Sequence, residues 1–338
     1  MVLLVIVLLA SIAWGAVGIS LNDMELALLH WSKGKEPGSI YESVFLQIRL
    51  PRVLLCCITG AILAVSGVLM QGLFRNPIVE PGLVGTSAGA ALGASFVFVF
   101  ASWFATEIQS IIGPFLVPIF AFAGALLSTF IVYQLSKSNS RVSLTSLLLV
   151  GVAINAVALS GTGFMTYLAR DPQARSISFW NLGTFSGASW FQVEIVFLVA
   201  LVVITIAIAD AKKLNAFILG EEEASYLGID TKRLKRKILV INTAMVAIAT
   251  SFVGVIAFMG LIVPHVMRLL VGSDHRKLIP ASIFGGAILL LIADMGARLL
   301  LAPAEIPIGI ITSLVGAPVY ILLLKQHNFI DKRGGEHD

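Results

Sequence analysis

The feature that most constrains this chain is a series of continuous apolar runs, each close to twenty residues long. A transmembrane helix needs about 20 consecutive apolar residues, whereas the strands of a membrane barrel alternate in polarity. Hydrophobic residues make up 58% of the 338 residues and charged residues 12%, against about 45–50% and about 25% in soluble domains. The sequence therefore predicts an all-α polytopic membrane protein, with clear spans at 1–20, 53–74, 83–104, 111–135, 143–168, 191–209, 277–297 and 306–324. The first run lacks the basic segment of a signal peptide, so we expect it to be retained as a span.

The longest apolar run, residues 238–271, would extend about 51 Å as a single helix, too long for one crossing and too short for two full ones. Basic residues stand at both ends, between Lys232 and Lys237 and between Arg268 and Lys277. Lysine and arginine concentrate in cytoplasmic loops, so both ends should lie on the same side. We predict that the run crosses and returns, turning near Gly254 to Gly260, as a full span at about 238–256 and a short one at about 258–270. The count then reaches about ten spans.

The distribution of basic residues predicts the orientation of the chain. With both termini in the cytoplasm, the inner side carries 16 of the 23 lysines and arginines and the outer side carries seven. The inner set is Arg75, Lys137, Arg141, Lys212, Lys213, Lys232, Arg233, Lys235, Arg236, Lys237, Arg268, Arg276, Lys277, Lys325, Lys332 and Arg333. The outer set is Lys33, Lys35, Arg49, Arg52, Arg170, Arg175 and Arg298. The opposite orientation would reverse this bias, against the positive-inside trend.

The chain lacks the residue patterns of several other classes of protein. No basic cluster is interleaved with aromatic residues, so we expect no nucleic-acid partner. Cys56 and Cys57 are adjacent within an apolar run and have no metal-ligand spacing, so they are expected to pack, and no metal site is expected. No G-x-x-x-x-G-K-[ST] motif is present. The chain is therefore expected to bind no cofactor itself, and ATP with its magnesium would be bound by a partner subunit.

Residues 85–89, GTSAG, match the G-x-S-x-G pattern of a serine nucleophile. That motif belongs between a strand and a helix of a soluble sheet, and the serine needs a base within hydrogen-bonding reach. None of the five histidines lies mid-membrane in the predicted topology, so an intramembrane hydrolase using Ser87 is the least favoured alternative. Gly85, Gly89 and Gly93 stand four residues apart, a spacing typical of closely packed membrane helices.

Three arginines lie at the predicted outer ends of spans, against the general charge trend: Arg49, Arg52 and Arg298. They could contact lipid phosphates, and Arg298 could pair with Asp294 four residues earlier. They could equally form a docking site for carboxylates of an external protein, through charge-assisted forks. Asp294 is the only carboxylate near the interior of a span, and we expect it close to the surface. Proton-coupled transporters usually carry buried ionisable groups, so an ion-coupled secondary transporter is kept as an alternative.

Two loops are longer than simple connectors. The predicted external loop from Arg170 to Trp190 contains SISFWNLGTFSGASW, which predicts an interfacial helix because tryptophan prefers the membrane surface. The predicted internal loop from Asp210 to Lys237 is the most polar part of the chain. Within it, Gly220 to Gly228 predicts a short helix, with acids at its start and a glycine that can end it.

Several motifs, in this order, resemble the FecCD-type permeases of bacterial ABC importers, which take up iron-siderophores, haem and vitamin B12. They are RLPR, GAILAVSGVLMQGLFRNPIVEPGLVGTSAGAALGA, GEEEASYLGI, FMGLIVPHVMRLLVGSDHR, ADMGARLL and AEIPIGIITSLVGAPVYILLL. The resemblance covers nearly the whole chain and implies a ten-span, type II ABC importer permease fold. It also implies a homodimer, two ABC ATPase subunits on the cytoplasmic side, and a periplasmic or lipid-anchored substrate-binding protein outside.

The resemblance also implies roles for individual residues. Arg49, Arg52 and Arg298 match arginines that receive acidic residues of the binding protein. The ATPase-coupling segment corresponds to Gly220, Glu221, Glu222, Glu223, Ala224, Tyr226, Leu227 and Gly228. The translocation path and its inner gate correspond to Ser143, Leu144, Thr145, Ser146 and Asn155, although Leu144 departs from the small polar residues of the family. Residues 76–81 and 260–265 are expected counterparts in an inverted repeat.

The combined expectation is one transmembrane permease domain over residues 1–338, with a cytoplasmic coupling segment at about 210–237. Such a subunit translocates substrate and is not an enzyme. It would lie in the bacterial inner membrane, in contact with lipid, with both termini cytoplasmic. The resemblance favours a metal chelate as substrate, haem or a ferric siderophore first because GLFRNP and RSISFW look most like haem permeases, and cobalamin next.

Overall fold

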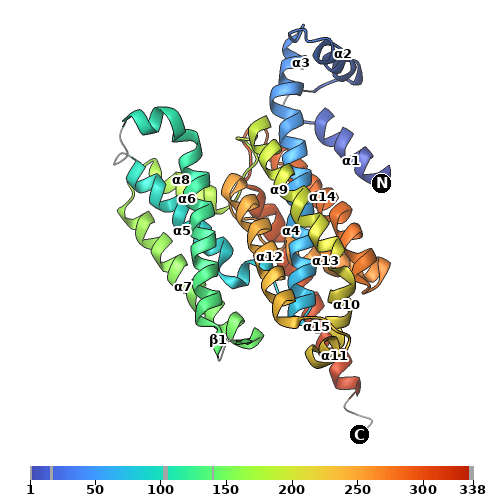
Figure 1. Cartoon of the computed structure of the whole chain (residues 1–338). Coiled ribbons are helices and arrows are strands. Elements are labelled where there is room, and N and C mark those ends of the chain that lie inside the picture. Colours follow the sequence, from blue (N-terminus) through green and yellow to red (C-terminus); the bar gives the residue numbers. More distant parts are fainter. Residues whose placement is uncertain (1, 16–17, 102–105, 139–140, 335–338) are drawn as a thin grey trace.

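The computed structural model describes residues 2–15, 18–101, 106–138 and 141–334, and the described part is mainly helical (Figure 1). Its only strands form a short antiparallel hairpin, β1 (Lys137–Ser138) and β2 (Arg141–Val142). The helices, in chain order, are α1 (Val2–Ala13), α2 (Leu21–Ser32), α3 (Ile40–Val44), η1 (Phe45–Arg49), α4 (Leu50–Phe74), η2 (Pro81–Val84), α5 (Thr86–Phe100), α6 (Thr106–Leu135), α7 (Leu144–Leu168), α8 (Gln173–Asn181), α9 (Trp190–Ala209), α10 (Ala211–Leu219), α11 (Glu221–Tyr226), α12 (Thr231–Val253), α13 (Met259–Val271), α14 (His275–Leu299) and α15 (Ile308–Gly334). The predicted all-α class is confirmed.

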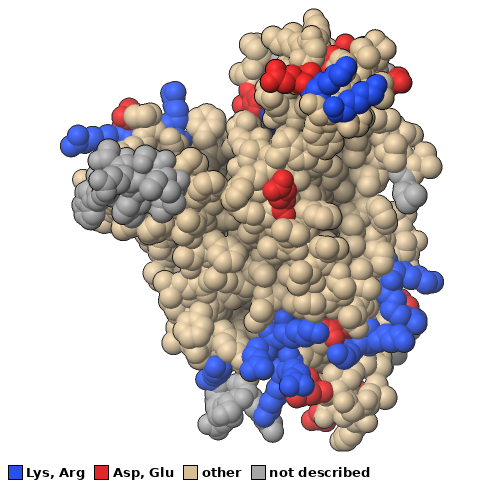
Figure 2. All heavy atoms as spheres, turned by 45° about the horizontal axis from the view of Figure 1, so that its top comes forward, with Lys and Arg blue, Asp and Glu red and all other residues tan. Residues whose placement is uncertain are grey.

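Six helical segments of the described chain are long and apolar enough to cross a membrane: Ile40–Phe74, Gly113–Leu135, Leu144–Leu168, Trp190–Ala209, Thr231–Val253 and His275–Leu299. Four shorter apolar helices accompany them: Val2–Ala13, Thr86–Phe100, Met259–Val271 and Ile308–Leu322. Figure 2 shows a broad, nearly uncharged belt between two charged ends. The chain is therefore a multi-pass membrane protein, whereas the total of ten spans stays a prediction.

Helix α4 runs through the middle of the bundle and packs against α9, α12, α13 and α14 (Figure 1). Most of its residues are buried, and glycines let two neighbours approach its backbone. A methyl group at Gly60 would collide with the carbonyl of Gly286 in α14, and one at Gly67 would collide with the carbonyl of Gly260 in α13. Membrane helices gain most of their attraction from such close packing. The glycines of α4 therefore fix the depth at which α13 and α14 meet it.

The long apolar run forms two helices, as predicted. Helix α12 ends at Gly254, which has φ 77°, and α13 starts after Phe258, which has φ 67°. A non-glycine residue with positive φ is strained unless its surroundings hold it there. The amide of Phe258 donates to Oε1 of Glu80 at 3.0 Å, and this contact fixes the start of α13.

The expected span at 83–104 is a shorter helix than predicted. Arg75, at φ 52°, ends α4 in the left-handed conformation, and the chain turns back so that the ring of Pro81 packs on Gly260. Asn242, halfway along α12, donates to the Pro81 carbonyl at 3.3 Å. Helix α5 then begins at Thr86, well inside the bundle. Glu80 and Pro81 thus fill the space beside the start of α13.

The glycine repeat in α5 is confirmed as a helix-packing motif. A methyl group at Gly89 would meet the backbone of Gly124 in α6, and one at Gly93 would meet the carbonyl of Phe120. Hydroxyl groups add hydrogen bonds between the start of α5 and α6. Thr86 and Thr129 share a hydrogen bond of 2.9 Å, and the Ser128 hydroxyl donates to the Gly85 carbonyl at 2.8 Å.

The first predicted span is also shorter than expected. Helix α1 has 12 residues and extends about 18 Å, less than the ~30 Å hydrocarbon core. Ser20 then caps α2 in a reciprocal capping box with Asp23. A new helix therefore begins where the predicted span ends. The stretch predicted as an interfacial helix, residues 176–190, is helical only in its first part, because α8 ends at Asn181. The indole of Trp190, at the start of α9, donates to the Leu46 carbonyl at 2.9 Å.

We predict that Gly67→Ala destabilises the protein, because the added methyl collides with the Gly260 backbone. Overpacking typically costs about 1–3 kcal/mol, which outweighs the roughly 1 kcal/mol that alanine gains over glycine in a helix. The measurement is thermal unfolding of the purified protein in detergent. Gly163→Ala in α7 is the control, since nothing lies within 4 Å of its added methyl group. Equal melting temperatures for the two variants would contradict the prediction.

Candidate docking, coupling and path residues

The three outer arginines gather around one buried carboxylate at the end of the bundle where α4 begins. Arg52 donates from Nε and Nη2 to Oδ1 of Asp294, at 3.2 and 2.9 Å. Nε of Arg298 lies 2.9 Å from Oδ2 of Asp294, so the i,i+4 pair is confirmed. Asp294 is fully buried, and the expectation that it lies near the surface was wrong. Helix α14 places it against α4, where Arg52 neutralises it.

The end of α1 covers this arginine cluster. Arg298 donates to the carbonyls of Ser11 and Trp14 at 3.0 and 3.1 Å and to the Ser11 hydroxyl at 2.9 Å. Arg49 donates to the Trp14 carbonyl at 2.7 Å. A methyl group at Gly15 would collide with the Arg49 guanidinium. The arginines satisfy carbonyls that the last turn of a helix leaves unpaired, and they are only 6–7% exposed.

Glu305 is the part of this cluster that solvent reaches, because its side chain is 39% exposed. Nη1 of Arg52 donates hydrogen bonds to both carboxylate oxygens of Glu305, at 2.8 and 3.0 Å. Sequence reasoning missed Glu305, although AEIP between two apolar runs was a usable signal. In this conformation the predicted docking arginines therefore face the interior, and one of them already holds an exposed carboxylate.

The segment predicted to couple to an ATPase lies at the opposite end of the molecule, as helix α11 (Figure 1). Gly220 and Gly228, at φ 153° and φ 81°, bracket it, so the predicted short helix ended by a glycine is confirmed. Ala224 is buried, whereas Tyr226 and Leu227 are 87% and 65% exposed. Glu222 and Glu223 are also exposed, so α11 presents apolar and acidic side chains together.

Lys235 connects α11 to Val142, which precedes the start of α7. Its Nζ lies 2.6 Å from a carboxylate oxygen of Glu221 and 3.5 Å from the Val142 carbonyl. A cavity of about 800 Å³ lies beside it, lined by the predicted gate residues Ser143, Leu144 and Thr145 and by the coupling residues Glu221 and Glu222. Ser143 caps α7 by accepting from the amide of Ser146 at 3.4 Å. Two sets of residues that the sequence placed apart thus share one cavity.

Asn155, predicted to line the path, faces another part of the chain. Its Nδ2 lies 3.4 Å from the carbonyls of Gly82 and Leu83, so it ties α7 to η2. Other positions of α7 remain open: Leu149 and Val157 are 68% and 66% exposed. An apolar helix face with so little cover needs lipid or another helix against it.

Ser87 lacks the surroundings of a nucleophile. It opens α5 directly behind the left-handed Gly85, and within the described part of the chain no histidine is hydrogen-bonded to its hydroxyl. Among the described residues no group of three or more His, Cys, Asp or Glu could hold a metal ion. Cys56 and Cys57 are both free thiols.

The structure thus combines a multi-pass bundle, two helices that begin inside it, a covered arginine cluster at one end and an exposed short helix at the other. Helices broken within the membrane region are typical of transport proteins, so the class indicated is a membrane translocation component. The model of the FecCD transport family matches residues 3–326. The chain belongs to the FecCD transport family.

Individual relatives agree with this assignment. The chain is 38% identical over 327 residues to the hemin transport system permease protein HmuU of Yersinia pestis, covering 96% of this chain and 94% of that protein. It is 40% identical over 279 residues to the cobalamin import system permease protein BtuC of Halobacterium salinarum, covering 82% and 72%. A solved structure described as a metal-chelate type ABC transporter in an inward-facing conformation matches with a TM-score of 0.83 at 30% identity, covering 96% of this chain and 97% of that one.

We predict that Asp294→Asn strongly destabilises the protein, because it leaves Arg52 and Arg298 buried beside a neutral amide. Removing one partner of a buried ion pair costs about 3–5 kcal/mol. Thermal unfolding in detergent measures the effect. Arg276→Gln is the control, because Arg276 forms an exposed ion pair with Asp274 and should leave the melting temperature nearly unchanged. A melting temperature of Asp294→Asn equal to that of the control would contradict the structural role assigned to the cluster.

Proposed function

We propose that this chain is the membrane-spanning permease subunit of an ATP-driven ABC importer that works by alternating access. The observation that carries the proposal is helix α11, which exposes Tyr226 and Leu227 at the basic end of a FecCD-family fold. Large apolar side chains beside charged ones are typical of a protein-binding surface. An ATPase subunit docked there would supply the nucleotide site for which this sequence has no motif.

The assembly proposed is a homodimer of this chain with two ATPase subunits at the α11 end and a substrate-binding protein at the arginine end. The exposed apolar face of α7 supports a second copy or lipid as its cover. The basic bias at the α11 end supports a cytoplasmic location for that end, with about ten spans and both termini inside. A bacterial inner membrane fits the HmuU relative of Yersinia pestis.

The substrate proposed is a metal chelate. Haem stands first because the HmuU relative, named as a hemin permease, matches nearly the full length of this chain. Ferric siderophores share that rank, and cobalamin follows from the BtuC relatives. The cargo would cross in a cavity between two copies, reshaped when the ATPases close.

The coupling route proposed runs through Lys235. A displacement of α11 would move Glu221, and the Lys235 ammonium would transmit that movement toward Val142 and the first turn of α7. A charge-assisted hydrogen bond is strong enough to keep these elements together during such a movement. The residues at that turn, Ser143 to Ser146, are proposed as the inner gate.

The function is tested by reconstituting the chain in proteoliposomes with the ATPase and binding protein encoded beside it. Hemin uptake that requires ATP is expected, and it should be lost with Tyr226→Ala, which removes the exposed contact of α11. Leu198→Ala is the control, since that side chain is 61% exposed on α9, a helix with no part in the proposed coupling route, gate or docking site. Uptake that survives ATP depletion and collapses with an uncoupler would instead indicate an ion-coupled secondary transporter.

Docking of the binding protein is proposed at the arginine cluster, with Glu305 occupying the place of an incoming carboxylate. Charge reversal at Arg49 or Arg52 is a poor test, because both side chains are buried and bonded within the chain. Glu305→Gln weakens only the ion pair between Arg52 and the exposed carboxylate of Glu305. We predict that it tightens binding of the binding protein by several-fold, measured by surface plasmon resonance. Glu36→Gln, at another exposed outer acid, is the control, and weaker binding with Glu305→Gln would show that Glu305 assists docking.

A further inference from the structure

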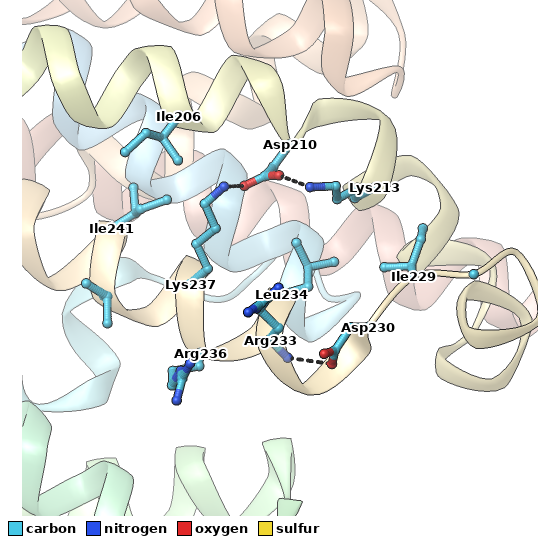
Figure 3. Close-up of a pocket in the computed structure, with 12 residues that line it drawn as sticks. Ile206, Asp210, Lys213, Ile229, Asp230, Arg233, Leu234, Arg236, Lys237 and Ile241 are labelled. Atoms are coloured by element: carbon cyan, nitrogen blue, oxygen red, sulfur yellow. Dashed lines mark hydrogen bonds and ion pairs between the residues drawn. The ribbon is translucent and has the colours of Figure 1, made fainter.

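A basic pocket with an apolar wall opens where α9 ends and α12 begins (Figure 3). Its volume is about 710 Å³. The wall is formed by aliphatic side chains of α9 and α12, among them Ile206, Leu234 and Ile241. Four cationic residues and two acids line the rest: Lys213, Arg233, Arg236, Lys237, Asp210 and Asp230.

The acids of this pocket are engaged in holding its basic side. Asp210 is almost completely buried and pairs with Lys213 at 2.7 Å and with Lys237. Burial raises the pKa of Asp210, but the hydrogen bonds from the two lysines outweigh it and hold the pKa below its usual value. Asp230 caps α12 by accepting from the amide of Arg233 at 2.9 Å. Both carboxylates thus position cations around the pocket.

The guanidinium groups of Arg233 and Arg236 are the available charges. Both residues are exposed, and neither guanidinium has a hydrogen bond or ion pair with any described residue. Figure 3 shows both arginines on the first turns of α12, with Arg233 near Asp230. The pocket therefore has two fixed ammonium groups and two uncommitted guanidinium groups, an arrangement suited to a phosphate.

An apolar groove continues from the basic pocket. It lies between α6 and α12 and has a volume of about 310 Å³. Leu126, Phe130, Leu239, Val240 and Ala244 form its apolar lining, and Thr129, Tyr133, Thr243 and Arg236 complete it. Arg236 and Val240 line both the pocket and the groove. Val240 and Phe130 are 63% and 57% exposed, so the groove opens on the outer surface of two spanning helices.

We infer that the pocket and groove bind one anionic phospholipid from the leaflet at the basic end. Its phosphate would lie among Lys213, Arg233, Arg236 and Lys237, and an acyl chain would fill the groove beside Val240. Basic pockets between membrane helices suit acidic headgroups, and the adjoining groove favours a lipid over a soluble phosphate. The inference depends on the multi-pass fold alone and holds whichever substrate the chain carries.

A lipid bound here would also contact the coupling segment. Gly228 and Ile229, at the end of that segment, line the same pocket. The headgroup would thus bridge the loop before α12 and the start of α10. Occupancy should stabilise the inner end of the bundle in addition to binding there.

The test is lipid titration of the purified full-length protein in detergent, followed by native mass spectrometry. The probes are phosphatidylglycerol and phosphatidylcholine with identical acyl chains, and soluble glycerol phosphate. The double variant Lys213→Gln/Arg233→Gln removes two pocket charges while Lys237 still pairs with Asp210. Lys212→Gln/Lys232→Gln is the matched control, because these neighbours are exposed and do not line the pocket.

The expected result is preferential binding of phosphatidylglycerol over phosphatidylcholine. The pocket variant should weaken this binding about tenfold or more, because two positive charges near the headgroup are lost. The control variant should leave it unchanged. Equal weakening in both variants would overturn the inference, because it would show a diffuse charge effect. Displacement of the lipid by equimolar glycerol phosphate would also overturn it in favour of a soluble phosphate site. Equal binding of both lipids would show that the cations play no part. A melting temperature of the pocket variant equal to that of the control shows that it is folded.

Discussion

Inside a bilayer the backbone has no water to bond with, and this constraint governs the middle of the molecule. The chain is irregular before Pro81 and again before Phe258, beside the largely buried helices α4 and α12. Asn242 bonds the Pro81 carbonyl, and Glu80 accepts from the Phe258 amide. Gly67 lets Gly260 approach closely enough for both segments to be enclosed. Two helices can therefore begin within the bundle without leaving these groups unpaired.

The arginine cluster, at the end of the bundle where α4 begins, meets a different constraint, which is the pairing of buried charges. Arg52 and Arg298 share the carboxylate of Asp294, and the last carbonyls of α1 accept from Arg49 and Arg298. Buried charges are tolerable only when they are paired and hydrogen-bonded. The same contacts tie α1 to α4 and α14. A docking role for these arginines thus has to act through Glu305, the member of the cluster that solvent reaches.

The end of the bundle that carries α11 combines two features around α12. On one side, Lys235 joins α11, the helix proposed to couple to an ATPase, to the start of α7. On the other side, Lys237 pairs with Asp210 in the pocket assigned to a lipid. Neighbouring positions of a helix point in different directions. The short basic segment at the start of α12 therefore contributes both to the surface proposed to face a partner protein and to the pocket proposed to face lipid. The basic residues whose distribution predicts the orientation of the chain therefore also belong to separate local sites.

Sequence alone determined the class, six of the helical spans and the two places where charges gather, because hydropathy and charge can be read from each residue in turn. It also predicted the division of residues 238–271 into two helices, since a 34-residue run cannot match the bilayer thickness. It gave Asp294 a surface position and α5 a full span, and both were wrong. Burial of Asp294 depends on Arg52, which is 242 positions away, and the start of α5 depends on Gly260 and Asn242. Only the tertiary structure decided these points, because contacts between distant helices set the depth and the partner of each polar group.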